Sequence, residues 1–256
     1  MKLKSKLTIF LVAAAGIAPL ADAAMLPSSG NVKFYDTPNN NQSNGGGEFR
    51  ADILEFGTSA DQYTFCLEVS ESIKLDRKYR YTIDTAATSG GKNLDTGTPG
   101  RDTISKGTAF LFELFAKGAL LGDWSGFSGF GINYTANRVG NSALMQKAIW
   151  ALEDEKSFIS NPTSTSHYSA NGNIFLDLAI AQNGSSFTNA RMDFDPNTTG
   201  VRVMNIEKWS RRKQKWVEGQ SQLVWDPSPV SDSGTTATLM LAGLIGLAAI
   251  RRKTRQ

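Results

Sequence analysis

The hydrophobic pattern changes twice along this chain, and that order limits the fold more than any other feature. Apolar and polar residues alternate in the segments 48–54, 61–69 and 79–83, which is the period-two pattern of half-buried strands. From residue 105 the apolar residues recur at helical spacing, and alternation returns near residue 190. This order predicts an α+β fold, a single domain in which antiparallel β-strands flank two or three central helices.

The helical pattern is strongest in the segment SALMQKAIWALEDEK, where apolar residues line one face and Asn141 or Ser142 can cap the N-terminus. The Gly- and aromatic-rich segment 123–140, which precedes it, is expected to be an irregular loop. Glu153, Asp154 and Glu155 are adjacent at the C-terminal end of the predicted helix 142–156. Their side chains therefore point in different directions and are expected to form a solvated face. The predicted helices are 105–121, 142–156 and 172–182.

Alternation predicts three late strand segments, the last two joined by a turn at Ser210–Lys213. We expect the basic residues of this turn either to keep it solvated or to attract an anionic polysaccharide. Tryptophans in the same strands either pack in the core or stack on sugar rings. The three segments are 190–194, 201–209 and 213–225, the basic residues are Arg211, Arg212, Lys213 and Lys215, and the tryptophans are Trp209, Trp216 and Trp225.

The first 23 residues have the order of a secretory signal peptide. Lysines at the start precede the apolar run Leu7–Leu20, and Ala21-Asp22-Ala23 offers a small-x-small cleavage site. The sequence therefore predicts an N-terminal signal helix in residues 1–23 and an exported body in residues 24–229.

The C-terminus combines an apolar run with a basic end. The 16 residues 235–250 contain no charge, and as a helix they would reach ~24 Å, slightly less than the hydrocarbon core of a membrane. Lysine and arginine are held on the cytoplasmic side during export. The tail therefore predicts a C-terminal membrane helix with the body outside the cytoplasm.

This tail resembles the VPDSG-CTERM variant of the PEP-CTERM sorting signals of bacteria, with serine at the position where that variant has proline. The resemblance implies recognition by an exosortase, a membrane cysteine protease that cuts near the motif. The alternative is an ordinary C-terminal membrane anchor. The residues that carry the resemblance are Val230, Ser231, Asp232, Ser233 and Gly234, followed after the apolar run by Arg251, Arg252 and Lys253.

Charge and composition exclude several classes of function. Seven of the 27 basic residues and one of the 24 acidic residues lie in residues 1–23 and 235–256, which leaves residues 24–234 with a net charge of −3 and argues against a nucleic-acid partner. The chain has one cysteine, Cys66, so no intramolecular disulfide can form. It also has one histidine, His167, and two such residues are too few for a His/Cys metal site. We expect His167 in a solvated loop. We expect no cofactor and no enzymatic activity.

Two short motifs resemble the thioester domains of bacterial surface adhesins. In that family a cysteine on an early strand joins the side chain of a glutamine in a TQxA motif. Here FCLE places Cys66 near the end of a strand, and MQKAIW places Gln146 early in a helix, with Met145 where the family has threonine. The resemblance implies a Cys66–Gln146 thioester, an internal acyl donor toward amines or hydroxyls of a partner.

A thioester must be shielded from water until a partner arrives. Glu68 lies two residues beyond Cys66 and so on the same face of the strand. We expect it either to accept a proton near the thiol or to form a surface salt bridge. The competing interpretation is that Cys66 is a small buried hydrophobe and Gln146 an exposed helix residue. The expected shielding aromatics are Phe65, Trp124, Phe127, Phe130 and Trp150.

The expected function is that of an exported bacterial surface or extracellular-matrix protein with a candidate thioester. Its expected partners are an exosortase-type enzyme, the membrane before processing, and a polysaccharide or surface protein. The alternatives are a non-reactive protein of an exopolysaccharide layer and a secreted hydrolase, for which the sequence offers no pair of opposed carboxylates.

Overall fold

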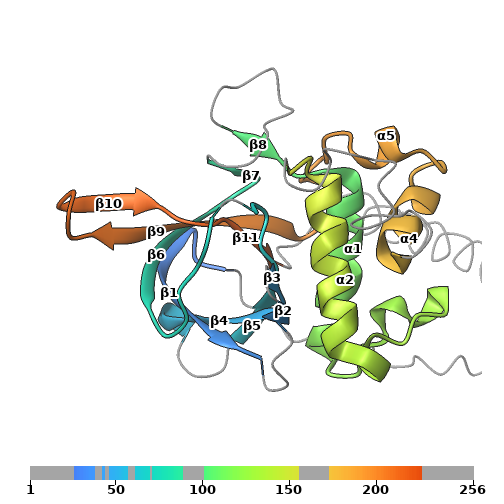
Figure 1. Ribbon diagram of the computed structural model, residues 1–256, viewed down its shortest axis with the longest axis horizontal. Helices are drawn as coiled ribbons and strands as arrows, with labels where there is room; N and C mark the ends of the chain where they lie inside the picture. Colours follow the sequence, from blue (N-terminus) through green and yellow to red (C-terminus); the bar gives the residue numbers. More distant parts are fainter. Residues whose placement is uncertain are drawn as a thin grey trace, which may run out of the picture.

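The computed structural model combines an antiparallel sheet with a few helices packed against it, and strands both precede and follow the helices. This mixed α and β architecture agrees with the fold class that the sequence predicts (Figure 1). The structure describes residues 26–37, 42–43, 46–56, 61–69, 71–88, 101–155 and 173–226.

The main sheet has seven strands in the order β10-β9-β6-β1-β4-β5, and β11 pairs with the first half of β9. Two small ribbons, β2 with β3 and β7 with β8, lie outside it. The bounds are β1 (Ser29–Asp36), β2 (Gln42–Ser43), β3 (Gly46–Gly47), β4 (Phe49–Ile53), β5 (Asp61–Thr64), β6 (Lys78–Asp84), β7 (Ala86–Ala87), β8 (Asp102–Thr103), β9 (Val201–Ser210), β10 (Lys215–Glu218) and β11 (Gln222–Trp225).

The sheet closes on itself just beyond β5. Cys66 forms an antiparallel bridge with Gln222 of β11. The Leu67 amide donates to the Ser221 carbonyl at 3.0 Å, and the Leu223 amide donates to the Phe65 carbonyl at 2.9 Å. Residues Phe65–Leu67 therefore close the sheet, and we call them the closing segment.

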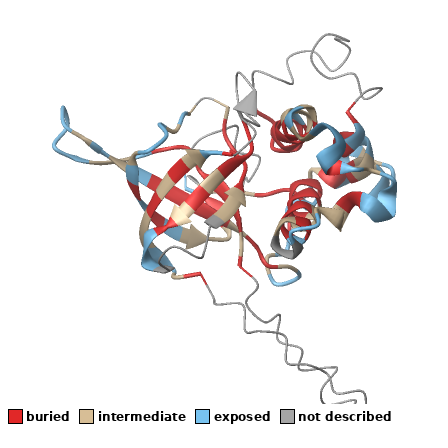
Figure 2. Cartoon of the chain, turned by 90° about the horizontal axis from the view of Figure 1, so that it is seen from below, coloured by how far each residue is buried: buried red, intermediate tan, exposed pale blue. Residues whose placement is uncertain are grey.

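The closed sheet encloses its own hydrophobic cluster. Alternate residues of β1 and β6 point inward, as the period-two pattern predicts, and Figure 2 shows buried positions alternating with more exposed ones along the strands. Trp150 enters this cluster from a helix. The buried members are Leu26, Val32, Phe34, Phe49, Ala51, Ile53, Cys66, Tyr79, Tyr81, Trp150, Met204, Ile206 and Val224.

Side-chain caps set the starts of the helices. Ser105 accepts from the Thr108 amide, Asn137 from the Gly140 amide, and Asn173 from the Phe175 and Leu176 amides. The α-helices are α1 (Lys106–Leu121), α2 (Arg138–Leu152), α4 (Ile174–Gln182) and α5 (Phe187–Ala190), and the 3-10 helices are η1 (Leu54–Phe56), η2 (Ser125–Phe130) and η3 (Tyr134–Asn137).

Three local predictions were wrong. Helix α2 begins four residues before Ser142, because Asn137 supplies the cap. The segment 123–140 is not irregular, since η2 and η3 occupy much of it, and a Cβ on Gly126 would overlap the Leu114 carbonyl of α1. The segment 190–194 is not a strand, because α5 ends in it and Asp193 makes a single bridge to Ser105.

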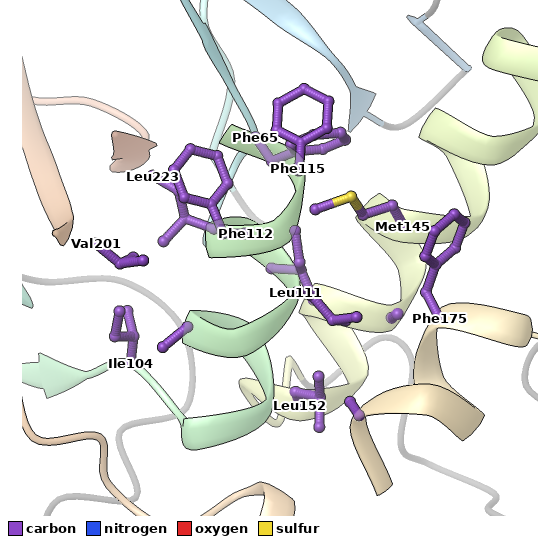
Figure 3. Close-up of a cluster of buried hydrophobic side chains, with 14 of the residues drawn as sticks. Phe65, Ile104, Leu111, Phe112, Phe115, Met145, Leu152, Phe175, Val201 and Leu223 are labelled. Carbon is purple, nitrogen blue, oxygen red and sulfur yellow. The ribbon is translucent and has the colours of Figure 1, made fainter. Parts of the chain in front are cut away.

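A second, larger cluster joins the closed sheet to the helices. Phe112 and Phe115 of α1 meet Met145 of α2, while Phe65 and Leu223 reach the cluster from the closing segment and β11 (Figure 3). Consecutive residues of the closing segment therefore face different clusters, with Phe65 and Leu67 toward the helices and Cys66 toward the interior of the sheet.

Candidate functional site

Gln146 brings helix α2 into contact with the closing segment of the sheet. Its side-chain nitrogen donates to the Cys66 carbonyl at 2.7 Å, and its oxygen accepts from the Cys66 amide at 3.0 Å. Gln146 is fully buried and Cys66 is 1% exposed. The two residues that the thioester resemblance selected, 80 positions apart, are therefore in direct contact.

Gln146 lies in the middle of α2, not early in a helix as predicted, because the helix starts at Arg138. The expectation of an exposed helix residue is also wrong. The carboxamide occupies the place of a strand neighbour, since it pairs with both backbone groups of Cys66.

The Gln146 oxygen accepts two backbone hydrogen bonds. Besides the Cys66 amide, the Gly47 amide of β3 donates to it at 3.3 Å. Two N–H groups aimed at one carbonyl oxygen polarise its carbon and stabilise negative charge on the oxygen during acyl transfer. This pair of donors is the principal chemical feature of the site, and we call it the two-amide hole.

The residue after Gly47 is held by a buried ion pair. Arg138 pairs with the fully buried Glu48 carboxylate, and the Tyr134 hydroxyl donates to the same carboxylate at 3.1 Å. The guanidinium of Arg138 also lies 3.7 Å from the Trp124 ring centroid. Burial raises the pKa of Glu48, although Arg138 and Tyr134 act in the opposite direction. This anchor fixes β3 against the helices and so helps to position the Gly47 amide.

The Cys66 sulfur is held by Gln222, a residue that the sequence analysis did not select. The Gln222 nitrogen lies 3.4 Å from the sulfur and its oxygen 3.8 Å from it. Thr64 fixes the amide by donating to that oxygen at 3.0 Å. The sequence did contain a signal for Gln222. It lies two residues before the buried Val224, and alternate residues of a strand share one face.

Where Cys66 carries a free thiol, its surroundings favour the protonated form. Burial raises the pKa of Cys66 to about 12, the hydrogen bond from Gln222 lowers it, and the nearby Glu68 carboxyl raises it. Attack by this sulfur therefore requires removal of its proton during the reaction.

The predicted shielding aromatics differ in burial and in the cluster to which they belong. Phe65 and Phe127 are buried in the cluster between sheet and helices, and Trp150 lies in the same cluster as Cys66. Trp124 packs partly buried on the edge of the larger cluster. Phe130 is 41% exposed and packs on Phe110.

The acidic residues near the site are buried, contrary to the sequence analysis. Glu68 is 1% exposed, so it does not belong to a surface salt bridge, and its carboxylate accepts from the Ser221 amide at 2.8 Å. Glu153, Asp154 and Glu155 are also buried. They end α2 by contacting other segments: Glu153 accepts from Ser105, Asp154 pairs with Arg191, and Glu155 accepts from the Val69 amide.

These carboxyl groups predict a protein that is more stable at mildly acidic pH. Burial raises the pKa values of Glu68, Glu71, Glu153 and Glu155. The folded state therefore binds protons more tightly than the unfolded state, and stability falls as the pH rises through the folded pKa values. Urea unfolding should give a larger free energy at about pH 5.5 than at about pH 7.5.

Glu68→Gln should reduce this pH dependence, whereas the exposed Glu207→Gln should leave it unchanged. A free energy of unfolding that rises from pH 5.5 to pH 7.5 would contradict the assignment.

Several predicted features lie outside the described residues, including the signal peptide, His167, the tail motif 230–234 and the basic end 251–253. Among the helices that the structure describes, none is long and apolar enough to cross a membrane. Within the same described ranges, no cluster of three or more His, Cys, Asp or Glu residues could hold a metal ion.

Comparisons of the chain with protein-family models, with curated proteins and with solved structures find no match.

Proposed function

We propose that this chain is an exported bacterial surface or extracellular-matrix protein in which Cys66 and Gln146 form an internal acyl donor for a partner. The observation that carries the proposal is the buried Gln146 carboxamide, whose oxygen lies in the two-amide hole and receives one of its two hydrogen bonds from Cys66 itself.

The proposed reaction balances without a cofactor. The Cys66 sulfur attacks the side-chain carbonyl carbon of Gln146, the carbon–nitrogen bond breaks, and the thiol proton leaves with the nitrogen as ammonia. The two-amide hole stabilises the negative charge that forms on the oxygen of Gln146. An amine of the partner then attacks the thioester, forms an amide with Gln146 and restores the Cys66 thiol.

The surroundings of the pair favour the lifetime of such a bond. Cys66 and Gln146 are almost wholly buried, and Phe65 and Trp150 pack in the two adjoining clusters. Water is therefore kept from the acyl carbon until a partner reaches it.

A specific observation favours the second candidate, a non-reactive structural protein of an exopolysaccharide layer. The hydrogen bonds of Gln146 satisfy both backbone groups of Cys66, so they stabilise the fold without any covalent chemistry. The polar contacts of the sulfur run to Gln222, and burial raises the pKa of Cys66.

Labelling with a small amine separates these candidates. Mature protein treated with biotin-cadaverine should acquire one label on Gln146 and one new free thiol on Cys66, because aminolysis opens the thioester. Cys66→Ala should abolish labelling, and the exposed Lys147→Ala should not change it. Equal labelling of wild type and Cys66→Ala, or a label on Gln222, would refute the Cys66–Gln146 bond.

The proposed route to the cell surface rests on the two ends of the sequence. The signal peptide directs export, and the tail 230–256 acts as a removable sorting signal for an exosortase-type enzyme. An epitope placed after Gln256 should be absent from mature protein in the native host. Its persistence on most molecules would favour a lasting membrane anchor.

A further inference from the structure

A hollow of about 300 Å³ lies beside the β9–β10 hairpin, against the last residues of β9 before the turn. This hairpin projects away from the helices, at the left of Figure 1, and its turn is exposed in Figure 2. The volume is at the lower end of the range for small-molecule sites. The hollow uses none of the residues of the Cys66–Gln146 site.

Three cations line the hollow. Lys74 and Arg77 come from the segment before β6, and Lys208 comes from β9. Arg77 is fixed in place because it donates to the Trp209 carbonyl at 3.2 Å. Glu71 lies close enough to attract Lys208, but no carboxylate is among the described residues that line the hollow.

The positive charge continues along the hairpin turn. Arg211, Arg212, Lys213 and Lys215 are exposed there. Residues 24–234 carry a net charge of −3 by sequence, so this concentration of cations is a local feature. A local excess of positive charge attracts extended polyanions and carries their negative groups toward the hollow.

The other lining groups favour a sugar. Ser72 and Ser210 provide hydroxyl groups that can exchange hydrogen bonds with sugar hydroxyls. Trp209 also lines the hollow and is 39% exposed, and an exposed indole can pack against the apolar face of a sugar ring. The turn residues 211–214 contain no apolar side chain that could insert into a lipid surface.

We propose that this hollow and the basic turn bind an acidic polysaccharide, with one negatively charged sugar residue in the hollow and its neighbours along the turn. This non-covalent site goes beyond the acyl chemistry proposed for Cys66 and Gln146 and does not depend on it.

The test is binding of the mature protein to alginate, a linear polyuronate, measured by surface plasmon resonance. Lys74→Gln combined with Lys208→Gln should weaken binding at least tenfold, because two cations of the hollow are removed. The backbone contacts of Lys74 with the Tyr79 hydroxyl do not involve the replaced side chain, so the variant should fold. Trp209→Ala should also weaken binding.

Lys106→Gln combined with Lys147→Gln is the matched control, because it makes the same charge change on exposed positions of α1 and α2. This control and Cys66→Ala should bind alginate as the wild type does. Neutral dextran should not bind, and binding should weaken as salt is raised from about 50 to about 300 mM.

Equal loss in the two double variants would overturn the proposal, because it would indicate a general charge effect. Tighter binding of oligo-dT or of anionic phospholipid vesicles than of alginate would also overturn it. Failure of alginate binding leaves the Cys66–Gln146 proposal intact, since amine labelling tests that chemistry separately.

Discussion

Replacing Gln146 by alanine should lower the free energy of unfolding by about 3 to 5 kcal/mol, because the change leaves a cavity and removes the partners of buried backbone groups. The groups affected are the Cys66 amide at 3.0 Å, the Gly47 amide at 3.3 Å and the Cys66 carbonyl at 2.7 Å. An unsatisfied buried polar group costs about 1 to 3 kcal/mol.

This experiment is best made in the Cys66→Ala background, where no covalent bond to Gln146 can form but the same backbone groups remain. Urea unfolding should show the loss for Gln146→Ala, while Lys147→Ala, which truncates the exposed neighbour on α2, should change stability by less than about 0.5 kcal/mol. A loss below about 1 kcal/mol for Gln146→Ala would mean that these hydrogen bonds do not hold the helix against the sheet.

Replacing Arg138 by alanine should cost a similar amount, about 3 to 5 kcal/mol, because it leaves a buried carboxylate without its cation. The Glu48 side chain is 0% exposed and that of Arg138 is 14% exposed. The change also removes the guanidinium that packs on Trp124. Because Glu48 follows Gly47, the two-amide hole should loosen, and amine labelling of the variant should slow.

Arg101→Ala is the matched control for this ion pair. Arg101 pairs with Asp84, but their side chains are 42% and 34% exposed, and such surface pairs contribute less than about 1 kcal/mol. Equal destabilisation by the two arginine substitutions, measured by urea unfolding, would show that burial of the Glu48 pair has no special energetic effect.

The local pattern of apolar and polar residues was sufficient to predict the elements that bury one regular face. The strand predicted at 79–83 is β6, and the helix predicted at 105–121 is α1, whose cap Ser105 was included in the predicted segment. In both, side-chain periodicity and secondary structure depend on neighbours in the chain.

The closing segment could not be predicted from local pattern. Cys66 pairs with Gln222, 156 residues later, and no periodicity within one segment indicates which distant strand completes a sheet. The same reason explains why Gln222 was overlooked.

The buried carboxylates were mispredicted because an acidic side chain is usually solvated. At Glu153 and Glu155 the hydrogen bonds come from Ser105 and Val69, in other elements. Sequence alone gives the charge of these residues. It does not give the distant amide and hydroxyl groups whose hydrogen bonds offset the cost of burying a carboxylate.

The pairing of Cys66 with Gln146 was suggested by a resemblance that rested on two short motifs. The structure adds contacts that neither motif contains, namely the Gly47 amide in the two-amide hole and the Gln222 amide at the sulfur. Both groups lie outside the two motifs, so only the folded chain could reveal their contacts.

Intact-mass spectrometry of the mature protein tests the acyl-donor proposal most directly. The account predicts a mass about 17 Da below that calculated for the observed termini, since one ammonia is lost when the thioester forms, together with no titratable thiol. Cys66→Ala should show no such deficit. A wild-type mass equal to the calculated value, with a free thiol on Cys66 after unfolding, would contradict the thioester and leave Gln146 as a structural partner of the closing segment.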